Sequence, residues 1–132
     1  MNNDNTTSLT KRMTEMIELA NVYLNHAPKH EKYGLCLQIR QSMYNIYGMI
    51  VECQKKYHKK TTLTNLDIEH EKLRMFWKLY FEMGYFNYHH NKRAKTEMEA
   101  YHRYEAISRL VDEVGAMIGG WIKKEREKEN NK

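Results

Sequence analysis

The chain has 132 residues, with 22 Lys or Arg and 17 Asp or Glu, which gives a formal net charge of +5. Its length fits one domain, and it contains neither a signal-peptide pattern nor an apolar run near the roughly 20 residues that span a bilayer. We therefore expect a soluble cytoplasmic protein. Cys36 and Cys53 are expected to be free buried thiols, as in a reducing compartment.

Apolar residues recur at helical spacing along almost the whole chain, which has one proline and six glycines. The first helix is expected from about Ser8, a candidate N-cap, to His26. The second is expected after Pro28 and ends at about His58. Their expected core residues are Leu9, Met13, Met16, Ile17, Ala20, Tyr23 and Leu24 in the first helix, and Leu35, Cys36, Ile39, Met43, Ile46, Tyr47, Ile50, Cys53 and Tyr57 in the second.

The third and fourth helices complete the expected fold. The third begins at Thr62 or Thr64 and is followed by a polar connection around residues 90–95; the fourth runs from about Thr96 to at least Lys124. The expected core residues of the third helix are Leu66, Leu73, Phe76, Trp77, Tyr80 and Met83. Strand signals are absent. Short connections between long helices favour an all-α, antiparallel up-down four-helix bundle over residues 8–124. We expect residues 1–7 to be disordered and residues 125–132 to form a frayed, charged tail.

The segment 110–124 is helical by pattern but carries Gly115, Gly119 and Gly120. A glycine inside a helix costs about 1 kcal/mol relative to alanine. We therefore expect another helix backbone to approach closely at these glycines. On a helical wheel Ser108, Gly115 and Gly119 form a narrow strip beside the apolar arc.

The second and third helices have more apolar surface than one bundle core requires. Leu37, Tyr44 and Val51 recur every seven residues, and Met75, Leu79 and Phe86 widen the arc of the third helix. Such surface is either the ordinary exposure of a small bundle or a set of subunit contacts. Arg40, near this surface, needs a partner, for which Asp112 is a candidate. The expected subunit interface comprises Leu37, Arg40, Tyr44, Val51, Met75, Leu79, Ser108, Asp112, Gly115 and Gly119.

Positive charge is concentrated in residues 28–95, which hold thirteen basic and six acidic residues. One basic run, 55–60, lies between the second and third helices, and another, 89–95, is expected at the opposite end of the bundle. Clustered cations attract a polyanion by releasing its counterions, although loop lysines are often only solvated. Tyr57, within the first run, could stack on a base. The candidate nucleic-acid-binding residues are Lys55, Lys56, Lys59, Lys60, Arg74, Lys78, Lys92, Arg93 and Lys95.

The sequence gives little support for catalysis or for bound metal. His26 and His30 flank Pro28, and His89 and His90 would point to different faces of a helix, so neither pair is expected to hold a metal ion. Phosphate-binding loops and nucleophile motifs are also absent. We expect a protein that is not an enzyme and has no cofactor and no metal.

Three segments carry a resemblance to a known family. They are Asp112-Glu-Val-Gly-x-x-Ile-Gly-Gly-Trp-Ile122, Pro28-Lys-x-Glu-Lys-Tyr-Gly-Leu-x-x-Gln-Ile-Arg40 and Leu73-Arg-Met-Phe-Trp-Lys-Leu-Tyr80. The chain resembles the accessory variability determinant proteins of diversity-generating retroelements, within the four-helix-bundle S23-like (rRNA-intervening-sequence) family. The resemblance implies a ring-shaped homopentamer with a central channel. Arg74 and Lys78 match the position of a basic pair in the family's third helix that serves nucleic-acid and polymerase binding. Lysine stands where arginine is expected, which keeps the charge and loses the planar fork.

The resemblance implies a non-enzymatic accessory protein that binds RNA, or an RNA–DNA hybrid, together with a reverse transcriptase. Such a protein would support cDNA synthesis in mutagenic retrohoming. Arg74 and Lys78 also have a purely structural explanation, because Asp67 and Glu71 share their helix face and could pair with them. Two alternatives therefore stay open: a structural oligomer of the S23-like family, and an adaptor whose basic ends bind an acidic protein.

Overall fold

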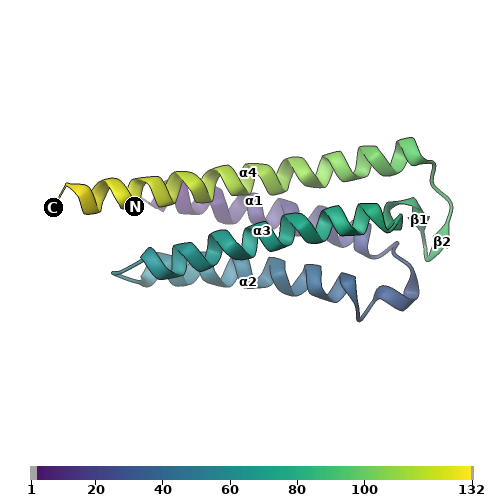
Figure 1. The fold of residues 1–132 in the computed structure, drawn as a ribbon, viewed down its shortest axis with the longest axis horizontal. Helices are drawn as coiled ribbons and strands as arrows, with labels where there is room; N and C mark the ends of the chain where they lie inside the picture. The colour runs from purple at the N-terminus through teal and green to yellow at the C-terminus, as the bar shows by residue number, and fades with distance from the viewer. Residues whose placement is uncertain (1–2, 132) are drawn as a thin grey trace.

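Four long helices form an antiparallel up-down bundle in the computed structural model, which describes residues 3–131 and the side-chain surroundings of residues 8–131 (Figure 1). The helices are α1 (Asn3–Leu24), α2 (Leu35–Lys55), α3 (Lys60–Glu82) and α4 (Glu97–Asn130). α1 and α3 each pack against both α2 and α4. The expected all-α four-helix bundle is confirmed. In the described part of the chain, no helix combines the length and apolar character that crossing a bilayer requires.

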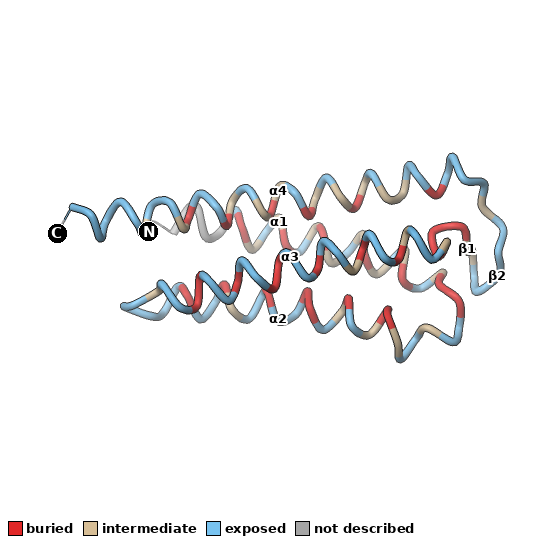
Figure 2. The backbone as a smooth tube through the Cα atoms, viewed as in Figure 1, coloured by how far each residue is buried: buried red, intermediate tan, exposed pale blue. Residues whose placement is uncertain are grey.

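Buried residues recur along all four helices (Figure 2), and their apolar side chains form one core. Most of the expected core residues are buried, among them Met13, Ile39 and Leu73. Cys36 and Cys53 are buried free thiols, as expected. Three expectations were wrong: Tyr47, Tyr57 and Met83 are exposed. Tyr57 and Met83 lie outside the helices, where helical periodicity no longer sets the direction of a side chain.

The end of α3 places Phe86 in the core. Gly84 has φ of +78°, a left-handed conformation that glycine adopts at little cost and that commonly ends helices. The short 3₁₀ helix η2 (Tyr85–Asn87) follows. Its Phe86 is 1% exposed and stacks on Trp77 with ring centroids 5.7 Å apart. The assignment of Phe86 to the outer surface was therefore wrong, because the chain reverses at Gly84 instead of continuing as helix.

A small β-hairpin follows η2, contrary to the expectation of no strands. β1 (Tyr88–His89) pairs with β2 (Lys92–Arg93), and the turn residues His90 and Asn91 have φ of 49° and 68°. Two-residue strands are too short to leave an alternating pattern in the sequence. The hairpin is fixed to the α1–α2 connection, because the Asn91 amide donates to the His26 carbonyl (3.2 Å) and the Asn91 side-chain oxygen accepts from the Lys29 amide. It thus brings residues 88–93 against the end of α1.

A capping box marks the start of α4, close to the expected position. The Thr96 hydroxyl accepts from the Glu99 amide and the Glu99 carboxylate accepts from the Thr96 amide, both at 3.2 Å. α2 begins at Leu35, after the 3₁₀ helix η1 (Lys29–Glu31), and ends before the expected His58. The α1 and α4 helices extend beyond the bounds expected for the bundle, to Asn3 and Asn130. Residues 1–7 were expected to be disordered, and of these, residues 1–2 lie outside the described residues.

Candidate nucleic-acid interface

The α2–α3 connection places the basic run 55–60 at the end of the bundle that also holds both termini (Figure 1). Two of its four lysines are tied down by the fold. The Lys59 ammonium donates to the carbonyls of Cys53 and Lys56, which satisfies acceptors at the end of α2. Lys56 lies 3.2 Å from the Glu52 carboxylate and donates to the Thr62 hydroxyl at 2.9 Å. These lysines first of all stabilise the connection.

The other two lysines of the run are the available cations. Lys55 and Lys60 are exposed, and neither ammonium has a hydrogen bond or ion pair with any residue that the structure describes. Lys55 ends α2 and Lys60 begins α3, so the two flank the connection. An unpaired ammonium at the surface is free to contact a phosphate without first giving up a protein partner.

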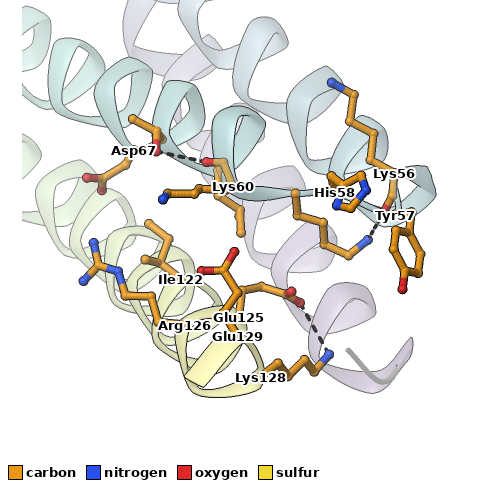
Figure 3. Close-up of a pocket in the computed structure, with 13 residues that line it drawn as sticks. Lys56, Tyr57, His58, Lys60, Asp67, Ile122, Glu125, Arg126, Lys128 and Glu129 are labelled. Carbon is orange, nitrogen blue, oxygen red and sulfur yellow. Dashed lines mark hydrogen bonds and ion pairs between the residues drawn. The ribbon is translucent and has the colours of Figure 1, made fainter. Parts of the chain in front are cut away.

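A groove of about 620 Å³ opens beside this connection, between the start of α3 and the last turns of α4 (Figure 3). Lys60 and Asp67 of α3 and Ile122, Glu125 and Arg126 of α4 lie around it. Its full lining is Lys56, Tyr57, His58, Lys59, Lys60, Leu63, Thr64, Asp67, Ile122, Glu125, Arg126, Lys128 and Glu129. Basic side chains outnumber acidic ones on this lining. The groove can therefore attract the backbone of a polyanion, although the carboxylates of Asp67, Glu125 and Glu129 on the same lining weaken that attraction.

Tyr57 is one of the residues that line this groove. Its side chain is 83% exposed and meets His58 edge to face, with centroids 4.8 Å apart. An exposed aromatic ring amid lysines is the combination found where proteins stack on unpaired bases. The arrangement keeps Tyr57 as the candidate stacking residue of the basic run.

Arg74 and Lys78 are exposed in the middle of α3, and both are paired within their own helix. Arg74 holds Glu71 through two hydrogen bonds of 3.0 and 2.6 Å, and Lys78 lies 3.6 Å from Glu82. The hydrogen bond raises the pKa of Arg74 and lowers the pKa of Glu71. Of the two partners expected for this pair, Glu71 is used and Asp67 is not. Because exposed ion pairs contribute little net stability, a phosphate could replace Glu71 at Arg74.

The second basic run lies at the opposite end of the bundle, on the hairpin (Figure 1). Lys92 and Arg93 form β2 and are exposed, with no ionic partner among the described residues. Lys95 follows them and is half-buried. The candidate cations therefore form two separate groups at the two ends of one chain, with Arg74 and Lys78 between them.

Three histidines meet at this end, which the sequence did not predict. His26 stacks on His89 with centroids 4.5 Å apart, and His90 lies 4.6 Å from His26 and 4.2 Å from His89. The sequence pattern singles out only the pairs His26–His30 and His89–His90, and this group takes one residue from the first pair and both from the second. Spacing along the chain gives no signal for this group, because the hairpin turn brings His89 and His90 to a residue far away in sequence.

Most of the side chains expected at a subunit interface are accessible in the single chain. Tyr44, Val51, Met75 and Leu79 are exposed, and Ile68 extends the apolar stripe of α3 at helical spacing. Leu37 and Ser108 are half-buried, while Asp112 and Gly119 are exposed. Whether these residues contact another subunit stays a prediction.

Within the single chain, Arg40 does not pair with its candidate partner Asp112. Arg40 instead donates to the amide oxygens of Asn21 and Asn25 on the α1 side, at 3.1 and 3.0 Å. Asp112 is close enough to Arg74 of α3 to raise its pKa. Arg40 and Asp112 therefore interact with different neighbouring helices.

The glycines of α4 have different surroundings from those expected. A Cβ at Gly115 would lie 2.5 Å from Cε1 of His70, whose Nε2 is 2.7 Å from the Val111 carbonyl oxygen. Gly115 thus admits a side chain of α3, and the expected close helix backbone is not there. At Gly119 and Gly120, apart from the adjacent residues and the nearby backbone of α4 itself, no described atom lies within 4 Å of an added Cβ. Packing within the single chain does not require these two glycines.

Comparison with known proteins gives a match to a family. A family model described as bAvd-like matches residues 8–125, which include most of α1 and α4 and all of α2 and α3. No curated protein and no solved structure matches the chain.

Proposed function

Because the chain belongs to the bAvd-like family, an accessory family associated with diversity-generating retroelements, we propose that it binds a reverse transcriptase and its template RNA. In this role it has no catalytic activity of its own. It holds enzyme, template and primer together while cDNA is made in mutagenic retrohoming. Family membership supports the polymerase half of the proposal.

The unpaired basic side chains at the two ends of the bundle support binding of the template RNA. Lys55 and Lys60 flank the α2–α3 connection beside the groove, and Lys92 and Arg93 occupy the hairpin, all four exposed and without an ionic partner among the described residues. Cations that neutralise phosphates release condensed counterions, which gives affinity without sequence readout. RNA and RNA–DNA hybrid are both suitable ligands, and selection of one template then comes from RNA shape or from the polymerase.

Assembly is the second part of the proposal. A ring of identical subunits, a homopentamer by family resemblance, repeats each group of cations around an axis. The exposed apolar side chains on α2 and α3 supply the subunit contacts, because large exposed apolar patches mark interfaces. Repetition raises the effective local concentration of binding sites for one RNA, so modest contacts add up to stable binding.

A salt titration of binding to structured RNA tests the nucleic-acid half. The natural chain is compared with a variant carrying Lys55→Gln and Lys60→Gln, while light scattering reports the assembly. We expect the slope of log affinity against log salt to flatten by roughly one for each phosphate that the variant particle no longer neutralises. The matched control is Lys123→Gln with Lys124→Gln, which removes two exposed lysines of α4 outside the groove lining.

The control shows whether RNA binding depends on the lysines beside the groove or only on the net charge of the chain. Equal slopes in the two variants would mean that only net charge matters, and absence of RNA binding at moderate salt would overturn the nucleic-acid role. The structural oligomer is then the better account. The internal pairing of Lys56, Lys59, Arg74 and Lys78 favours that second candidate, because these cations already have partners. Salt-sensitive protein binding without RNA binding would favour the adaptor.

A further inference from the structure

The three histidines at the hairpin end present their ring nitrogens to one small volume. Each can offer one nitrogen such that the three nitrogens all lie within 4.8 Å of one another. His26 follows the end of α1, and His89 and His90 come from the hairpin. The group therefore joins two segments that are separate in sequence, and a ligand held by all three would fasten the hairpin to the end of α1.

Imidazole nitrogens are the ligands that zinc and neighbouring transition-metal ions prefer, whereas magnesium and calcium prefer oxygen. Zinc binds histidine nitrogen at about 2.0–2.1 Å, so two such ligands of a tetrahedral ion stand about 3.4 Å apart. Because the nitrogens lie at most 4.8 Å apart, each separation must shorten by no more than about 1.4 Å. His90 is an exposed residue of the hairpin turn, so its side chain has room for that movement.

One nitrogen of the group lacks a partner. Nδ1 of His89 is buried and has no hydrogen-bond partner among the described residues. Buried polar atoms are nearly always paired, so an orphan of this kind needs an explanation, and an ion is one of the usual ones. The other two rings lie next to it, with His26 half-buried and stacked on it.

We propose that His26, His89 and His90 form a binding site for one divalent transition-metal ion, zinc in the first place. The fourth coordination position is open to water. This assignment goes beyond the proposed function and does not depend on it.

The charges around the site act in two ways. Burial and the neighbouring histidines, Lys95 and Arg103 lower the pKa of His26, and the same kinds of neighbour lower the pKa of His89. Neutral imidazole is the form that binds metal, so this favours binding near neutral pH. Lys95 and Arg103 also repel a cation, and none of the grouped metal-ligating residues is a carboxylate. The site is therefore weaker than a structural zinc site built from cysteines.

Metal binding also competes with one hydrogen bond. Nδ1 of His26 accepts from the His90 amide at 3.1 Å. A neutral imidazole has a single lone pair, so it cannot accept this hydrogen bond at Nδ1 and bind a metal ion at Nε2 at the same time. Zinc must either replace the amide at Nδ1 or break that hydrogen bond, and in both cases the environment of the His90 amide changes.

Calorimetric titration of the full chain with Zn²⁺ at pH 7.5 tests the site. We expect one ion per chain, and at least tenfold weaker binding in His89→Ala and in His90→Asn. Asparagine tolerates the left-handed backbone at position 90, so the second variant keeps the turn. His102→Ala is the matched control, because His102 is exposed on α4 and is not one of the three ligands.

NMR on the same samples separates this site from adventitious binding. We expect Zn²⁺ to shift the amide resonance of His90 in the natural chain and in the control variant. Absence of zinc binding, or binding as tight in both ligand variants as in the natural chain, would overturn the proposal. So would zinc binding that leaves the His90 amide resonance unchanged.

Discussion

Gly115 is the residue whose identity the single chain most clearly requires. An added methyl group would lie 2.5 Å from the buried His70 ring, which is held by the Val111 carbonyl. We predict that Gly115→Ala lowers the free energy of unfolding by about 1–2 kcal/mol, because overpacking outweighs the gain in helix propensity. Urea denaturation measures this change.

A double-mutant cycle with His70→Ala checks the cause. If the clash with the ring is responsible, the penalty of Gly115→Ala disappears once His70 is alanine. Gly120→Ala is the control at an open position, where alanine should stabilise the helix by up to about 1 kcal/mol. An equal loss of stability at positions 115 and 120 would contradict this account.

Burial also sets the reactivity of the two cysteines. Desolvation raises the pKa of both Cys36 and Cys53 to about 11. The thiolate is the reactive form, so we predict that alkylation by iodoacetamide at pH 8.5 is more than 100-fold slower in the native protein than in urea. Equal labelling rates in the two conditions would contradict the buried position.

The same shift affects stability in alkali. Each thiol has a folded-state pKa above its unfolded value, so its contribution to stability is fully present below about pH 9 and is lost as the pH rises toward 11. The melting temperature should therefore fall across that range.

Among the elements, long periodic segments were predictable and short ones were not. Leu9 to Leu24 and Leu35 to Cys53 repeat the helical period often enough to define a helix and its buried face. The hairpin at 88–93 has only two residues per strand, and Phe86 was misplaced because the chain reverses at Gly84. The turn conformation of His90 and Asn91 comes from contacts with His26 and Lys29, which local sequence does not specify.

The apolar stripe on α3 carries the prediction of assembly. Met75 and Leu79 are 46% and 44% exposed and contribute little to the bundle core. We predict that Met75→Gln with Leu79→Gln dissociates the oligomer into 16.0 kDa chains and leaves the helix content unchanged. Light scattering and circular dichroism measure the two quantities.

The control replaces apolar residues elsewhere on the surface. Met98 and Tyr101 near the start of α4 are also exposed and lie outside the predicted interface, so their replacement by glutamine should leave the assembly intact. A natural chain that is monomeric at micromolar concentration, or a stripe variant that still assembles, would contradict a subunit contact on this face.

For the molecule as a whole, the sequence predicted where the basic residues lie but not which of their side chains have partners within the protein. It placed the two basic runs at opposite ends, as the bundle has them. It gave Glu71 and Asp67 as possible partners of Arg74 but could not choose between them, and it could not show that Lys59 caps α2, because those contacts depend on the rotamers and on the point where α2 ends. The histidine group was missed for the same reason as the hairpin.

The basic residues beside the groove and on the hairpin support the central proposal, that this chain works as part of a complex with polymerase and template. The most direct test is cDNA synthesis by the partner reverse transcriptase on its template RNA, with the natural chain, with the Lys55→Gln and Lys60→Gln variant, or with no addition. We predict that synthesis requires the natural chain and that the variant supports several-fold less. Synthesis that is equally efficient without the chain would contradict the accessory role.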